Sequence, residues 1–145
     1  MRITRKTFMI GATASLLALG GAAYAMQSEA PADAEAYIIS PASGETVSNP
    51  VTVVFGLRGM GIAPAGVEQS MTGHHHLLIN QPIDELDLLN PLPADDRVRH
   101  FGGGQTEVTL ELPAGTHTLQ LLLGDHNHIP HDPVVASEVI TVTVE

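Results

Sequence analysis

The sequence lacks cysteine and tryptophan, and only 3% of its 145 residues are aromatic. The absence of cysteine excludes disulfide bonds, a thiolate nucleophile, cysteine-type zinc sites, a lipid anchor on cysteine and a blue-copper centre. The shortage of aromatic side chains argues against a stacking platform for sugars or nucleic-acid bases. Any chemistry that this chain performs must therefore rest on other side chains.

Basic residues are also scarce, with six lysines and arginines against sixteen acidic residues. Three of the six, Arg2, Arg5 and Lys6, lie at the very start, and every acidic residue lies at Glu29 or later. The rest of the chain thus has three basic and sixteen acidic residues, a net charge of −13 with histidines neutral. Nucleic acids and anionic membrane surfaces are bound through basic patches, so we expect neither as a partner.

Residues 1–25 have the features of a secretory signal peptide. A basic start precedes an apolar stretch over 8–21, and Ala23-Tyr24-Ala25 has the small-x-small pattern of a cleavage site. We therefore predict a periplasmic or secreted mature protein without membrane insertion; a retained anchor is the alternative, for which the apolar stretch is short. Residues 26–36 are polar and rich in Ala, Pro and Glu, which predicts a disordered linker.

Residues 37–145 have the pattern of one all-β domain. Short β-branched or leucine-rich runs alternate with turns rich in Gly, Pro, Asn and Asp. The pattern predicts seven strands, at 37–40, 51–57, 74–80, 97–101, 106–112, 117–123 and 138–144. The leucine-rich stretch over 84–93 is expected to form either one helical turn or an irregular crossover. Because no amphipathic helix of useful length is present, we predict an immunoglobulin-like antiparallel β-sandwich.

Histidine is the residue type that this small acidic chain has in excess, with eight copies. In an immunoglobulin-like Greek key, the loops after the second, fourth and sixth strands gather at one end of the sandwich. That end would hold seven of the eight histidines: His74, His75, His76, His100, His126, His128 and His131. The eighth, His117, lies at the other end in phase with inward leucines, so we expect it to be a hydrogen-bonded structural residue.

Imidazole is the commonest protein ligand for zinc, copper, nickel and non-haem iron, and three segments converge here. The sequence therefore predicts a metal site drawn from these seven histidines, with Asp125 as a ligand or as an acceptor that orients an imidazole. Strand alternation places His74 and His76 on one face and His75 on the other, so all three cannot bind one ion without a bulge.

Copper or zinc is the expected ion. Met60 and Met71 lie in the loop before the third strand, and thioether with imidazole slightly favours copper, although loop methionines more often serve in packing. The expected function is storage, delivery or sensing of the ion. The alternatives are a metal-dependent enzyme with an open mononuclear site, a metal-free adhesion or scaffolding module with a histidine hydrogen-bond network, and a pH-responsive surface. An enzyme is less favoured, since no specific nucleophile stands out.

Four histidine-containing blocks also carry a family resemblance. They are GHHHLLI at 73–79, HFGGGQTE at 100–107, LPAGTHTLQL at 112–121 and GDHNHIPH at 124–131. Together they resemble a family of small exported bacterial proteins catalogued as domain of unknown function 4399, over roughly residues 37–145. The resemblance implies an exported domain; it carries over no activity and no catalytic residue.

Overall fold

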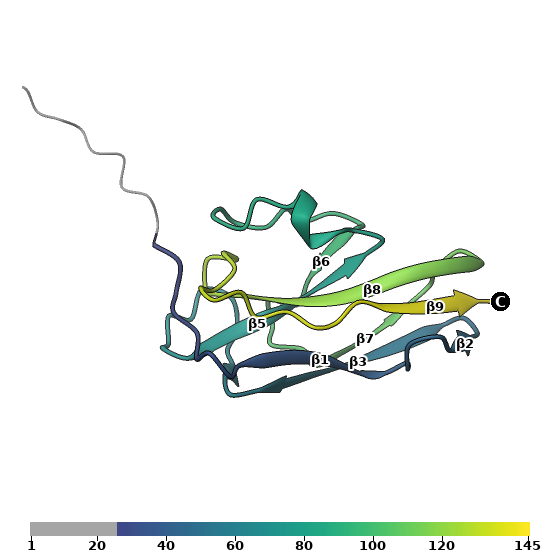
Figure 1. Cartoon of the computed structure of the whole chain (residues 1–145), viewed down its shortest axis with the longest axis horizontal. Helices are drawn as coiled ribbons and strands as arrows, with labels where there is room; N and C mark the ends of the chain where they lie inside the picture. Colours follow the sequence, from purple (N-terminus) through teal and green to yellow (C-terminus); the bar gives the residue numbers. More distant parts are fainter. Residues whose placement is uncertain (1–25) are drawn as a thin grey trace, which may run out of the picture.

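Two β-sheets packed face to face form the domain (Figure 1). The computed structural model describes residues 26–145, and the predicted signal peptide lies outside the described residues. One sheet has the order β1-β3-β7, from β1 (Glu35–Ser40), β3 (Val51–Arg58) and β7 (Glu107–Leu110). The other has the order β2-β9-β8-β5-β4, with β6 paired to β5. Its strands are β2 (Thr46–Val47), β4 (Gly61–Ile62), β5 (Thr72–Ile79), β6 (Val98–His100), β8 (Gly115–Gly124) and β9 (Ile140–Val144).

The predicted all-β sandwich is confirmed, and each of the seven expected strands overlaps an observed one. Alternation explains why: Val51, Val53 and Phe55 of β3 are buried in the core between the sheets, while Thr52 between them is exposed. The expected crossover contains one 3-10 turn, η1 (Ile83–Glu85). Within residues 26–145, no helix has the length and apolar character needed to cross a membrane.

β6 joins a different sheet from the one that the immunoglobulin constant-type pattern gives to the fourth strand. It pairs antiparallel with β5, and His100 lies directly opposite His76 in the register. Val98, two residues earlier, lies opposite Leu78, and both are buried. Burial of this apolar pair accounts for the position of β6, because it covers a part of β5 that would otherwise face water.

β5 is consequently buried on both faces. Leu77 and Ile79 point into the core between the sheets, whereas Leu78 joins a second, smaller cluster on the outer face with Leu92, Val98 and Leu122. The segment between β5 and β6 provides part of this outer cover, and Figure 1 shows it lying over the six-stranded sheet, on the side away from β1 and β3. The outer face of β5 can therefore hold a buried site.

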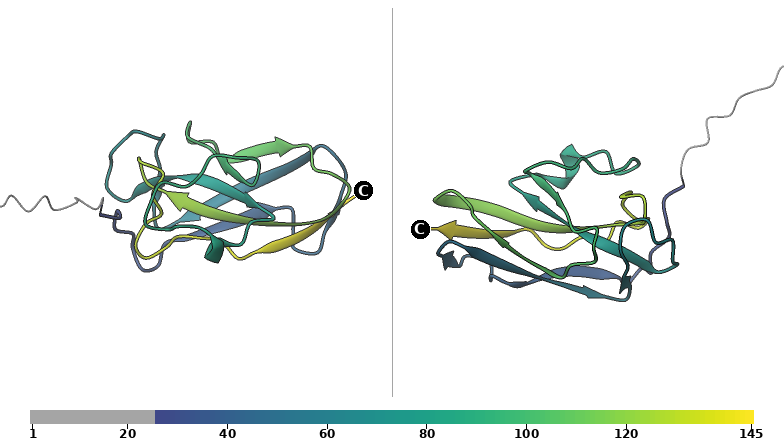
Figure 2. Two further views of the ribbon diagram at one scale, coloured as in Figure 1. Left: turned by 90° about the horizontal axis from the view of Figure 1, so that it is seen from above. Right: turned by 180° about the vertical axis from the view of Figure 1, so that it is seen from behind.

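The segment expected to be a disordered linker lies against the domain instead. The Gln27 side chain donates to the carbonyls of Leu88 and Pro130, and the backbone of Ala30 donates to that of Asp132. β1 then begins at Glu35. The polar composition of this stretch predicted disorder, because it offers few apolar side chains to bury. Hydrogen bonds of the Gln27 amide and of the backbone hold it to the domain, chiefly at the 125–132 loop. Both views of Figure 2 show this stretch at the end of the sandwich opposite the C-terminus.

Candidate metal centre

The three consecutive histidines of β5 are divided between the two faces of the sheet. His74, His75 and His76 are exposed by 0%, 1% and 0%. His75 points into the sandwich core, where its ring lies 5.2 Å from that of Phe55 between centroids. The rings of His74 and His76 lie together on the outer face, 4.6 Å apart. The period of two along a strand thus selects two of the three for any shared site.

His128, from the loop after β8, completes a group of three on that outer face. Its Nδ1 lies 2.9 Å from Nε2 of His74 and 3.3 Å from Nε2 of His76. One ligand atom from each of the three residues lies within 4.8 Å of the others, and this group can hold a metal ion. His74 and His76 are fully buried and His128 is half-buried, so the group is reached from the loop side.

The 125–132 loop is folded so that His128 faces the sheet. The Asp125 carboxylate accepts backbone N–H bonds from Asn127, at 2.8 Å, and Ile129, at 3.0 Å, and a hydroxyl bond from Ser28, at 2.8 Å. His128 itself has a positive φ of 65°, an uncommon conformation for a residue with a side chain. Its carbonyl accepts from the backbone of Leu92, which ties the loop to the segment covering the sheet.

Gly124, the last residue of β8, leaves the room that the His76 ring occupies. A Cβ atom built on Gly124 would lie 2.5 Å from Cε1 of His76 and 3.1 Å from its Nδ1. No side chain fits at such distances without displacement of the ring. Position 124 is therefore glycine because an imidazole fills its side-chain space, rather than because of a turn.

His100 adds a fourth imidazole beside the group of three. Its ring lies 4.3 Å from that of His76 and 4.7 Å from that of His128 between centroids. Its Nε2 donates to the carbonyl of Pro93 at 2.7 Å, which leaves the lone pair on Nδ1. We call His74, His76, His100 and His128 the histidine cluster, and the subset without His100 the ligand triad.

Burial keeps the imidazoles of the ligand triad in the neutral form that binds metals. Desolvation lowers the pKa of His74 from 6.5 to about 4, with further lowering by His128 and His100. Desolvation likewise lowers the pKa of His76 from 6.5 to about 2, and that of His128 below its ordinary value. A protonated imidazole has no free lone pair, so at neutral pH the ligand triad is ready to coordinate a cation.

The hydrogen bonding of the ligand triad is incomplete without a cation. A neutral imidazole nitrogen offers either one proton or one lone pair, so Nδ1 of His128 cannot make a full hydrogen bond to both Nε2 atoms beside it. The Nδ1 atoms of His74 and His76 are buried and have no partner among the described residues. These Nδ1 atoms point away from the shared contact, so the incomplete hydrogen bonding that a cation could relieve is that of the two Nε2 atoms around Nδ1 of His128.

The other residues that the sequence singles out have separate surroundings. His126 contacts the amide of Asn127, and His131 donates from Nε2 to the carbonyl of Thr72 at 3.2 Å. Asp125 is engaged with backbone amides and Ser28, and His75 faces the opposite side of β5. Met60 packs against the main core, and Met71 is 52% exposed.

The expected structural role of His117 is confirmed. Its side chain is 8% exposed, its Nε2 donates to the carbonyl of Pro113 at 2.8 Å, and its Nδ1 accepts from the Asn80 amide at 2.9 Å.

Two features of the site were missed by sequence reasoning. The first is that the cluster lies on the outer face of the sheet, beneath the crossover segment, rather than in loops at the tip of the sandwich. The leucine content of 84–93 was the available signal, since those leucines need a surface to cover. The second is Gly124, whose space for an imidazole no local pattern reveals.

Comparison with known proteins identifies one family. The family described as Domain of unknown function (DUF4399) matches residues 53–145, well over half of the chain. That stretch contains every histidine of the cluster. No curated protein and no solved structure matches the chain.

Proposed function

The chain belongs to the family described as Domain of unknown function (DUF4399), and on the geometry of the histidine cluster we propose that it binds a transition-metal ion, copper or zinc. The ligand triad of His74, His76 and His128 would provide the nitrogen donors. The biological role that fits best is storage, delivery or sensing of the ion in the periplasm or outside the cell, in keeping with the predicted signal peptide.

The spacing of the donor atoms carries this proposal. Nitrogen ligands 2.0–2.1 Å from a tetrahedral ion lie about 3.3 Å from one another. The observed separations to Nδ1 of His128, 2.9 and 3.3 Å, are close to that spacing. A single ion would take a lone pair from each nitrogen and so replace contacts that hydrogen bonds satisfy only in part.

A coordination position left for exchange also supports the proposal. Three protein ligands leave a tetrahedral ion open at its fourth position, as delivery and metal-dependent catalysis require. His100 lies next to the triad with its Nδ1 lone pair free, and we propose it as the residue that closes or opens this position. A closed four-histidine site would favour storage, whereas an open site that turns over a substrate would indicate an enzyme.

The test is a calorimetric titration of Cu²⁺ and Zn²⁺ into the tag-free protein. We expect one site per chain, tighter than about 1 µM. His128→Asn should weaken it by at least about 100-fold while keeping the loop, because asparagine also adopts positive φ. His126→Asn is the matched control, since His126 lies in the same loop and contacts Asn127; it should change affinity by less than about threefold. Absence of a stoichiometric site, or equal losses in the two variants, would refute the proposal.

A further inference from the structure

One cavity of the domain lies away from the histidine cluster, between β6 and β7. It has a volume of about 630 Å³, within the range of small-molecule sites. β6 is paired only with β5, and β7 only with β3, so the facing edges of the two sheets are both open here among the described strands. The displaced position of β6 creates this gap in the sandwich wall.

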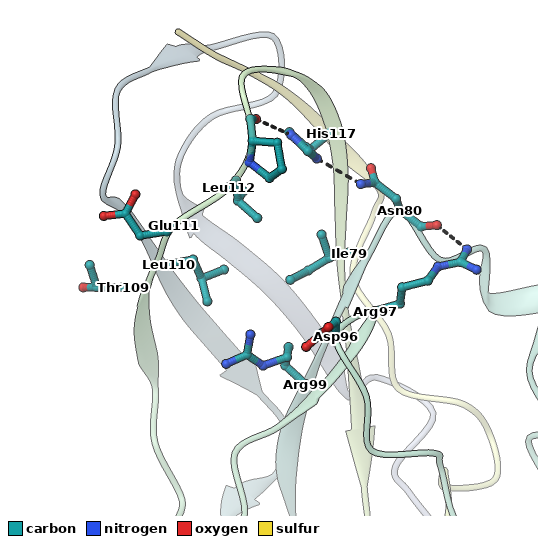
Figure 3. Close-up of a pocket in the computed structure, with 11 residues that line it drawn as sticks. Ile79, Asn80, Asp96, Arg97, Arg99, Thr109, Leu110, Glu111, Leu112 and His117 are labelled. Carbon is teal, nitrogen blue, oxygen red and sulfur yellow. Dashed lines mark hydrogen bonds between the residues drawn. The ribbon is translucent and has the colours of Figure 1, made fainter.

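The floor of the cavity is apolar. Ile79 of β5, Leu110 of β7 and Leu112 line it, and Figure 3 shows their side chains between the two edge strands. All three side chains are at most 7% exposed, so the floor is a continuation of the main core. His117 and Asn80 form the end wall, and their hydrogen bonds to Pro113 and to each other hold it in place.

Two arginines line this cavity, and they point in different directions (Figure 3). Arg97 and Arg99 are two of only three basic residues after position 6, in a part of the chain with a net charge of −13. Arg97 donates to the carbonyl of Asn80. Arg99 extends from β6 towards the β7 side (Figure 3) and forms no ion pair within residues 26–145. The third, Arg58, is paired with Glu35 on the other sheet.

We propose that this cavity binds a small carboxylic acid with an apolar chain. The Arg99 guanidinium would hold the carboxylate, as its planar fork suits that group. The apolar chain would lie on Ile79, Leu110 and Leu112. Asp96 and Glu111 also line the cavity, and their charges disfavour anions with more than one negative charge.

A purely protective role is the competing explanation for the arginines, because inward charges on edge strands discourage association between sheets. That role requires no ligand and no apolar floor. It also predicts that loss of Arg99 promotes association without changing affinity for any small molecule. The two explanations therefore differ in what the protein binds.

The test is a titration of octanoate into the purified protein, followed by calorimetry and by methyl NMR. We expect saturable one-to-one binding, with shifts of the Ile79, Leu110 and Leu112 methyl signals. Butanoate, which covers less of the floor, should bind at least about tenfold more weakly, and inorganic phosphate should not displace octanoate. Free leucine, titrated in the same way, distinguishes a simple carboxylic acid from an amino acid, which offers the same carboxylate and apolar chain. Binding of either ligand that depends on Arg99 supports the proposal.

Two charge-matched variants complete the experiment. Arg99→Gln should weaken octanoate binding at least about tenfold, and Arg58→Gln, which removes the same charge elsewhere, less than about twofold. Equal losses in the two variants would mean general electrostatic attraction and would overturn the proposal. So would absence of saturation up to about 10 mM, or methyl shifts outside the cavity. The wild-type methyl shifts decide the matter if Arg99→Gln associates or misfolds.

Discussion

Replacing Gly124 by alanine tests whether the histidine cluster depends on close fit. The new Cβ would lie 2.5 Å from Cε1 of His76, whereas ordinary contact begins near 3.4 Å. The ring must therefore move by about 0.9 Å, the difference between these two distances. Metal–nitrogen bonds tolerate about 0.2 Å, so His76 would leave the coordination sphere.

The expected loss of metal affinity is about 100-fold or more, comparable to other displacements of about 1 Å at functional sites. Overpacking of this kind also costs about 1–3 kcal/mol of stability, which corresponds to a fall of about 4–12 °C in Tm for a domain of this size. The measurements are a Zn²⁺ titration by calorimetry and thermal denaturation with and without zinc. The added metal should raise the Tm of the wild-type protein and leave that of Gly124→Ala almost unchanged.

Gly61→Ala is the control for this experiment. A Cβ at Gly61 would meet Thr72 Cγ2 at 3.5 Å and the Met71 carbonyl at 3.9 Å, which is ordinary contact. It lies in β4, beside the start of β5, and adds the same methyl group without touching a histidine. We expect its metal affinity to equal that of the wild type. A folded Gly124→Ala protein that binds zinc as tightly as Gly61→Ala would refute the argument from close fit.

Three further predictions concern the same region. Burial lowers the pKa values of the three β5 histidines from 6.5 to about 4 or below, so the folded state holds fewer protons than the unfolded chain. The free energy of unfolding of the metal-free protein should therefore be highest above pH 6.5. It should fall by up to about 1.4 kcal/mol per pH unit for each group as the pH drops towards 4, as measured by urea denaturation. His75→Phe should be neutral or stabilising and should reduce that acid sensitivity while zinc affinity is kept, because both ring nitrogens of His75 are buried without partners among residues 26–145. A loss of zinc affinity would contradict the placement of His75 on the other face of β5. Asp125→Ala should weaken zinc binding about tenfold or more although it removes no ligand of the triad, because it frees the backbone amides that shape the loop carrying His128. Amide hydrogen exchange at Ile129 should become faster in the same variant. Weaker zinc binding with unchanged exchange would instead indicate that Asp125 is a ligand.

The strands could be predicted because each one is encoded by residues close together in the chain. Short β-branched or leucine-rich runs between turns gave the positions of β3, β5 and β8 to within a few residues. The period of two along a strand assigned His74 and His76 to one face of β5 and His75 to the other. It could not say which face looks into the core, because the outer face is also covered, by leucines of the crossover segment.

The local sequence pattern does not show which of the loop histidines joins the two imidazoles of β5. His126, His128 and His131 are equally plausible ligands by spacing alone, and only His128 lies against the β5 imidazoles. Its direction depends on the bond from Ser28 to Asp125 in the same loop and on the bond from Leu92 to the His128 carbonyl, and both donors lie more than 30 positions away along the chain. Short-range propensity carries no information about such partners.

The amino-acid sequence by itself determined an acidic all-β domain, its strand positions and the abundance of imidazole, since composition and period-two patterning are local properties. Tertiary structure alone decided that β6 pairs with β5, that His100 thereby faces His76, and that Gly124 leaves space for a ring. These outcomes depend on which surfaces bury one another when distant segments pack. The ligand triad exists because a strand fixes two imidazoles and a remotely anchored loop brings the third within 2.9 Å of one and 3.3 Å of the other.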